Sequence, residues 1–114
     1  MTDHLSPGQE LFHNQSITSA DGRFQLIMQT DGNLVLYRTH DHHALWSSRT
    51  DQSDAQRAIM QTDGNLVIYH VNNRPMWASN TNGSPGSHLI MQNDGNLVIY
   101  KPNVPIWASN TVQH

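Results

Sequence analysis

A nine-residue stretch occurs three times in the chain, as QTDGNLVLY at residues 29–37, QTDGNLVIY at residues 61–69 and QNDGNLVIY at residues 92–100. A tryptophan follows each copy, inside the strings WSSRT, WASNT and WASNT, at Trp46, Trp77 and Trp107. Turn, charged and apolar positions recur together, so chance is not a serious explanation for the match. We therefore predict one domain over residues 1–114, built from three internal repeats.

Each repeat has the pattern of β-structure. Short runs of Val, Ile, Leu and Tyr are bounded by Asp-Gly and by Ser/Asn/Gly clusters, and no stretch follows the helical period. A two-residue turn at the Asp-Gly would set Gln29 opposite Leu34 and mix polar and apolar residues on one face. A three-residue loop over 30–32, with Gly32 in the left-handed region, instead sets Met28 opposite Leu34 and separates the faces. We predict the three-residue loop and about a dozen short strands.

Strand alternation produces one apolar face in each repeat, which is the predicted core. Its residues are Leu26, Met28, Leu34 and Leu36, then Met60, Leu66 and Ile68, then Leu89, Met91, Leu97 and Ile99. Three sheets with one apolar face each must bury those faces against one another. The tryptophans can then meet near the middle, as core residues rather than as sugar-stacking platforms. The predicted fold is all-β, a prism of three antiparallel sheets with pseudo-threefold symmetry.

The two ends of the chain are unequal. The first motif is preceded by 28 residues, whereas 14 residues separate each of the first two tryptophans from the next motif. The N-terminal excess should therefore supply extra strands. Only seven residues follow Trp107, so the third sheet needs a strand from the N-terminal block or from another chain.

The opposite face of each repeat carries Gln, Asp, Asn, Val and Tyr at the same five positions. Exposed strand positions are otherwise free to vary between copies, so this repetition indicates a function. Amides, a carboxylate and a phenol next to a small apolar side chain suit the hydroxyls and the C–H face of a sugar. We expect each shallow site to bind with a dissociation constant on the order of millimolar, and multivalency to raise the effective affinity.

Composition argues against several other classes of function. With six Lys and Arg residues and a net charge of −3, the chain has no basic stripe for nucleic acid. No window approaches the ~18 apolar residues of a membrane span, so we predict no membrane insertion. No signal peptide is visible, which predicts a protein that is cytoplasmic or released by another route. A mature secreted protein whose signal has been removed would look the same.

Catalytic and metal chemistry have little support in the sequence. We find no Ser/His/Asp arrangement and no pair of carboxylates in distinct environments, so we predict that the protein is not an enzyme. The cluster His40, Asp41, His42 and His43 contains metal-ligand residue types. We interpret it as a solvated loop, because no such set recurs in the sister repeats.

The string Q-x-D-x-N-x-V-x-Y, intact three times, resembles the signature of the monocot bulb-type mannose-binding lectins, the snowdrop-agglutinin-like family with the B-lectin domain. The resemblance covers nearly the full chain, including LSPGQEL near the start and the W-[AS]-S-x-T strings. It implies the β-prism II fold with three four-stranded sheets, and a site for terminal α-D-mannose in each repeat that needs neither metal nor cofactor. It also implies a homodimer formed by exchange of the C-terminal strand, for which residues 108–114 have the right length.

The resemblance assigns a role to each of fifteen positions. The glutamines would bond the 3-hydroxyl of mannose, the Asp and Asn pairs the axial 2-hydroxyl, and the tyrosines the 4-hydroxyl, while the valines pack on the ring carbons. An equatorial 2-hydroxyl, as in glucose, would leave the Asp and Asn groups unpaired. The implied mannose-binding residues are Gln29, Asp31, Asn33, Val35, Tyr37, Gln61, Asp63, Asn65, Val67, Tyr69, Gln92, Asp94, Asn96, Val98 and Tyr100.

Two alternative functions remain open at this point. One is a lectin-type bacteriocin or toxin, in which mannose binding only targets the molecule. Such proteins resemble two lectin domains in tandem with an added tail, and this sequence has one domain. The other is a family member that has kept the fold but whose sites are inactive. The fifteen intact positions argue against this alternative.

Overall fold

The computed structural model of the protein describes residues 2–113. Met1 and His114 lie outside the described residues. They are the two ends of the predicted domain, and His114 also ends the tail that is expected to exchange. The described residues form twelve short strands, as the sequence predicts, and none of them builds a helix that could cross a membrane. In chain order the strands are β1 His4–Leu5, β2 Glu10–Phe12, β3 Ser16–Thr18, β4 Phe24–Met28, β5 Leu34–Arg38, β6 His43–Ser47, β7 Ala55–Met60, β8 Leu66–His70, β9 Pro75–Ala78, β10 His88–Met91, β11 Leu97–Lys101 and β12 Val104–Ala108.

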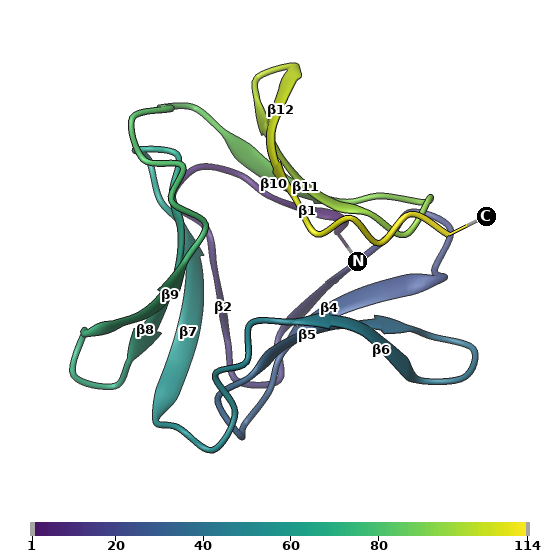
Figure 1. The fold of residues 1–114 in the computed structure, drawn as a ribbon, viewed down its shortest axis with the longest axis horizontal. Coiled ribbons are helices and arrows are strands. Elements are labelled where there is room, and N and C mark those ends of the chain that lie inside the picture. Colours follow the sequence, from purple (N-terminus) through teal and green to yellow (C-terminus); the bar gives the residue numbers. More distant parts are fainter. Residues whose placement is uncertain (1, 114) are drawn as a thin grey trace.

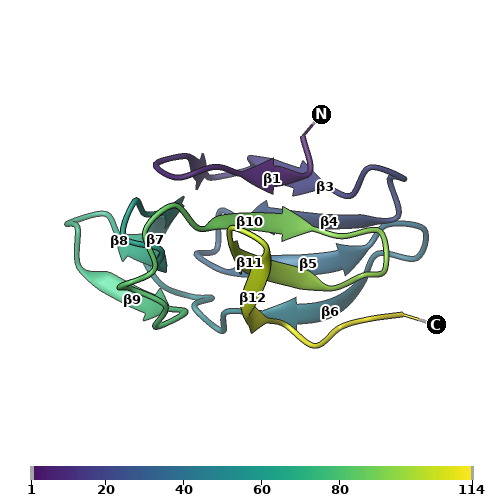
Figure 2. The same ribbon diagram turned by 90° about the horizontal axis from the view of Figure 1, so that it is seen from above.

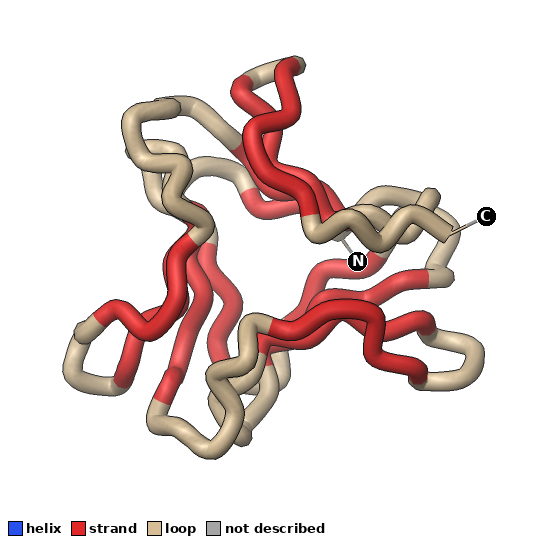
Figure 3. Tube along the Cα trace, viewed as in Figure 1, coloured by secondary structure: helices blue, strands red, loops and turns tan. Residues whose placement is uncertain are grey.

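The strands form three four-stranded antiparallel sheets, which confirms the predicted fold class. Their orders are β3-β4-β5-β6, β2-β7-β8-β9 and β1-β10-β11-β12. Figure 1 shows the sheets as the three sides of a triangle, and Figure 3 shows the loops that join them at the corners. Each sheet contains one complete repeat, since β4–β6, β7–β9 and β10–β12 are consecutive in the chain.

The N-terminal segment supplies the fourth strand of every sheet. Strand β1 pairs with β10, β2 pairs with β7, and β3 pairs with β4. The third sheet therefore takes its extra strand from the N-terminal block of the same chain, which was one of the two predicted sources. Seen from the side, β1 and β3 lie at one end of the prism, and β6 and β12 lie at the other (Figure 2).

The hairpin of each motif has the predicted three-residue loop. Met28 pairs with Leu34 in the first repeat, and the second and third repeats have the same register. The Gln29 N–H donates to the Asn33 carbonyl at 2.9 Å, and the Gly32 N–H donates back to the Gln29 carbonyl at 3.1 Å. Gly32 has a φ of 91°, a conformation that only glycine adopts without strain.

The inward faces of the three sheets fill the prism. Every residue of the predicted core is fully buried. Three tryptophans pack against this core near the end formed by β6, β9 and β12, with ring centroids 5.6, 5.6 and 5.8 Å apart and rings edge to face. The predicted contact of Trp46, Trp77 and Trp107 is thus confirmed, but the rings are partly buried and cover one end of the core instead of lying within it. An edge-to-face arrangement is favourable for aromatic rings.

Candidate functional site

The fifteen motif residues lie on the outward faces of the hairpins β4–β5, β7–β8 and β10–β11, five on each. Alternation turns Leu34 and Leu36 inward, so their neighbours on β5 point outward. Val35 is only 3% exposed, as are its two counterparts. The Gln, Asn and Tyr residues are half-buried, and the Asp at each turn is exposed. The structure therefore brings the five predicted residues of each repeat together around a small apolar floor.

A hydrogen bond between glutamine and tyrosine crosses each hairpin. Gln29 Nε2 donates to Tyr37 Oη, and the other two repeats make the same bond. Because the phenol oxygen accepts here, its own hydrogen is free to be donated elsewhere, as is the second amide hydrogen of the glutamine. This pair therefore presents two donors side by side at one edge of the site.

The aspartate of each motif stabilises its own turn. Asp31 Oδ1 accepts the backbone N–H of Asn33 at 3.0 Å, and the corresponding distances are 3.0 and 2.9 Å in the other repeats. One carboxylate oxygen is thus used by the backbone, which fixes the carboxylate plane. The second oxygen makes no such turn contact and can accept a bond from a ligand.

The asparagine side chain is held from behind. Asn33 Oδ1 accepts from Ser48 Oγ and from the Thr50 N–H, both at 3.2 Å. Ser48 Oγ also accepts the Leu34 N–H at 3.1 Å. Because the carbonyl oxygen has its partners inside the protein, the amide NH₂ is oriented outward as a donor.

The serine and threonine of this support are functional residues that the motif search missed. Ser79 and Thr81 hold Asn65 in the second repeat, and Ser109 and Thr111 hold Asn96 in the third. A signal for them was present in the sequence, because Ser and Thr recur in the string W-[AS]-S-x-T. Their role was not apparent, since the sequence does not show which strand pairs with the motif strand.

Comparison with solved structures finds lectins along nearly the whole chain. The lectin of Japanese Marasmius oreades is 32% identical, with a TM-score of 0.88, over 97% of this chain and 92% of its own. The novel monomeric monocot mannose-binding lectins from Gastrodia elata are 44% identical, with a TM-score of 0.85, over 98% of this chain and 100% of theirs. The mannose-specific agglutinin from snowdrop bulbs (Galanthus nivalis), complexed with methyl-α-D-mannoside, is 38% identical, with a TM-score of 0.79, over 98% and 99%.

The chain belongs to the bulb-type mannose-binding lectin family. Its fold is β-prism II, as the resemblance implied. No protein-family profile and no curated protein sequence matches the chain, so its membership rests on the similarity to solved structures.

The three sites of this bulb-type lectin differ next to the tyrosine. His42, from the loop between β5 and β6, stacks on Tyr37 with ring centroids 4.3 Å apart and planes inclined by 12°. In the second site the Arg57 guanidinium lies 5.0 Å from the Tyr69 ring centre. In the third site His88 lies 6.0 Å from Tyr100. The motif side chains thus repeat, whereas their surroundings do not.

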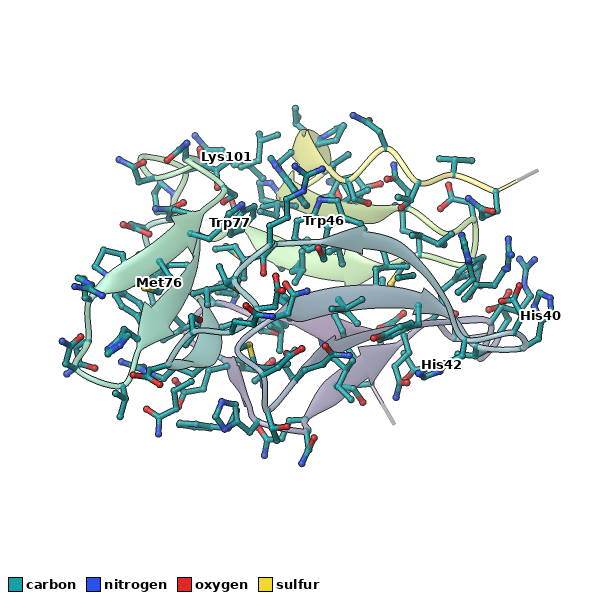
Figure 4. All side chains as sticks on the ribbon, turned by 60° about the horizontal axis from the view of Figure 1, so that its bottom comes forward. His40, His42, Trp46, Met76, Trp77 and Lys101 are labelled. Carbon is teal, nitrogen blue, oxygen red and sulfur yellow. The ribbon has the colours of Figure 1, made fainter. Side chains whose placement is uncertain are left out.

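His40, Asp41 and His42 of the histidine cluster form the exposed loop between β5 and β6, as predicted, whereas His43 is the first residue of β6. His40 and His42 lie at the tip between β5 and β6 (Figure 4). Asp41 accepts two bonds from the Arg38 guanidinium, at 3.0 and 2.6 Å, which hold the pKa of its carboxyl well below the usual range. Among residues 2–113, no three His, Asp or Glu side chains converge where they could hold a metal ion.

Proposed function

We propose that the protein is a non-enzymatic, multivalent lectin that binds terminal α-D-mannose on glycans through three metal-independent QxDxNxVxY sites. The observation that carries this proposal is the identity of the three sites at atomic level. Each has the same glutamine–tyrosine bond, the same aspartate-capped turn and the same serine-backed asparagine. Solved relatives are described as mannose-binding or as complexes with mannosides.

The arrangement of donors and acceptors fits the hydroxyls of mannose. The free Asp31 oxygen and the outward Asn33 amide form an acceptor and a donor around one position, where the axial 2-hydroxyl can use both. Gln29 and Tyr37 present donors for the 3- and 4-hydroxyls, and Val35 supports the ring carbons. An equatorial 2-hydroxyl would leave polar groups of the site without partners, so glucose should bind more weakly.

Multivalency supplies the affinity that one shallow site lacks. A dissociation constant on the order of millimolar corresponds to about −4 kcal/mol. The three proposed sites lie on three different sides of the prism. One chain can therefore bind several mannose termini of a clustered glycan at once only if the termini surround the chain, or if several chains assemble. We propose that chains pair into a homodimer by exchanging the C-terminal strand.

The contacts of the C-terminal strand support this exchange. Strand β12 pairs with β11 of the same chain, and Ser109 and Thr111 support Asn96. Exchange would replace these contacts with the same contacts made by a second copy, so little free energy separates the two forms. Sedimentation of the full chain distinguishes them, because a monomer at all concentrations would contradict the exchange.

Calorimetry with methyl α-D-mannoside tests the mannose sites. We expect three binding events per chain, and at least tenfold weaker binding of methyl α-D-glucoside. The triple variant Asp31→Asn, Asp63→Asn, Asp94→Asn keeps an oxygen for each turn but loses the carboxylate acceptor, and should abolish detectable binding. Asp51→Asn, at an exposed loop position, is the matched control. Unchanged mannose binding by the triple variant would rule out the assigned sites.

A further inference from the structure

We propose that the first mannose site continues across β6 to Arg49, and that this extension accepts an anionic group on the residue linked to the terminal mannose. The inference rests on the proposed function and adds a ligand class that the other two sites do not share. The inference is based on one position of the W-[AS]-S-x-T string at which the first repeat differs from the other two.

Arg49 occupies a position that the sister repeats fill with asparagine. It is the variable residue of W-[AS]-S-x-T, and its counterparts are Asn80 and Asn110. All three have a left-handed backbone, with φ of 58°, 60° and 60°. Asparagine adopts this conformation readily, whereas arginine does so at a cost. A strained residue that is kept in place is a reason to look for a function of its side chain.

The guanidinium of Arg49 is available to a ligand. The side chain is exposed, and among residues 2–113 no carboxylate lies within ion-pair distance of it. Arg23, Arg38 and Arg57 are instead each paired with an acidic side chain of the protein. Arg49 therefore contributes positive charge that the fold itself does not use.

Arg49 is one of the residues that line a hollow. It has a volume of about 620 Å³ and lies at the end of the prism where the tryptophans meet. Its lining includes Ser47 and Arg49 of the first repeat together with the three tryptophans. Figure 4 shows Trp46 and Trp77 next to each other at this end. The Ser47 hydroxyl, aromatic surface and one cation provide partners for a polar saccharide unit.

The proposed pose of mannose in the first site places C1 near Arg49. Tyr37 Oη meets Gln29, which follows β4, so the proposed contacts to the 3- and 4-hydroxyls lie on the β4 side. The ring rests on Val35, and Val35 pairs with Ser47 of β6. On a pyranose, C1 lies across the ring from C4. Arg49 lies between Ser48 and Thr50, which hold Asn33 beside the proposed place of the 2-hydroxyl. Because C1 is bonded to C2, a residue linked through C1 starts next to this segment, where Arg49 can pair with a carboxylate or phosphate through its planar fork of donors.

Site-resolved titration tests the extension. The probes are α-D-mannosyl glucuronic acid, its carboxyl-reduced counterpart α-D-mannosyl glucose, methyl α-D-mannosyl phosphate and methyl α-D-mannoside. Amide resonances of Asn33, Asn65 and Asn96 report the three sites separately by NMR. We expect an anionic probe to bind the first site about fivefold more tightly than its neutral counterpart, and this gain to shrink as salt screens the charge. The uronate and phosphate arms show which anion the hollow accepts.

Two variants provide the matched controls. Arg49→Asn gives the first site the residue of its sisters and should remove the gain for anions while leaving methyl α-D-mannoside binding unchanged. Asn80→Arg should transfer the gain to the second site. An equal gain at all three sites, no gain with either anion, or a gain that survives Arg49→Asn would overturn the extension. Failure of methyl α-D-mannoside to bind at any site would instead overturn the proposed function.

Discussion

Asn33, Asn65 and Asn96 show how a half-buried amide is turned into a directed donor. Each carbonyl oxygen accepts from a serine hydroxyl and a threonine N–H inside the protein. The amide NH₂ is consequently left to point away from these partners, toward the proposed ligand. Fixing the amide before binding lowers the rotamer entropy that binding would otherwise lose. The serine behind the asparagine is therefore a positioning residue for the site.

We predict that Ser79→Ala weakens mannose binding at the second site alone. The change removes the bond to Asn65 Oδ1 and leaves the buried Leu66 N–H without its partner. Unfolding free energy should fall by about 1–3 kcal/mol. Thr62→Ala, at an exposed turn position, is the control for stability and binding. Equal affinities at the second site in both variants, measured by NMR titration, would contradict the positioning role.

The motif hairpin is the element that builds each site. Its three-residue loop places the aspartate at the tip and pairs methionine with leucine on the inner face. In each repeat the loop glycine has positive φ. It also lies against the segment that follows the last strand of that repeat, which is β6, β9 or β12. A Cβ at Gly64 would lie 2.2 Å from the Ser84 carbonyl oxygen. Glycine is required here both by conformation and by the space available.

We predict that Gly64→Ala is far more destabilising than Gly83→Ala. Both glycines have positive φ, 93° and 87°, so both substitutions carry the conformational cost of about 1 kcal/mol. Only Gly64 has backbone atoms in the way of a Cβ, whereas nothing lies within 4 Å at Gly83. The difference in unfolding free energy should be at least about 2 kcal/mol, measured by denaturant titration. Similar values for the two variants would show that the loop tolerates the side chain.

The three sheets are held together differently at the two ends of the prism. At one end the N-terminal segment adds β1, β2 and β3 to the three sheets, so one continuous segment connects all of them. At the other end the three tryptophans pack edge to face and cover the core. Each repeat thus contributes one ring to a contact that no single repeat could form. The pseudo-threefold arrangement is stabilised by residues outside the QxDxNxVxY motif.

We predict that Trp77→Ala lowers the unfolding free energy by about 3 kcal/mol, because two aromatic contacts and part of the core cover are lost. For a domain of this size the melting temperature should fall by about 10 °C. Trp77→Phe should recover part of this loss. Val71→Ala, in the exposed turn of the same sheet, is the control. A loss no larger than that of Val71→Ala would show that the tryptophans do not hold the sheets together.

The sequence by itself determined the hairpins and the content of the sites. Alternation fixes which residues of a strand share a face, and the Asp-Gly loop fixes the register, so both the core and the fifteen motif positions were predictable from local pattern. The tryptophan contact was also predictable, because three equivalent apolar residues follow three equivalent hairpins. The hairpins and their faces depend on interactions between residues close in the chain, whereas the tryptophan contact was predicted from the threefold repeat.

Only the tertiary structure decided what meets each hairpin from outside. The pairing of β1 with β10 and the place of Ser48 behind Asn33 depend on where other segments run in space. The stacking of His42 on Tyr37 lies within one hairpin and depends on the conformation of the β5–β6 loop. The sequence alone does not single out Arg49 among the arginines. Its place beside the hollow and the first site follows from the pairing of β6 with β5. Long-range packing energy selects these neighbours, and a local pattern carries no record of it.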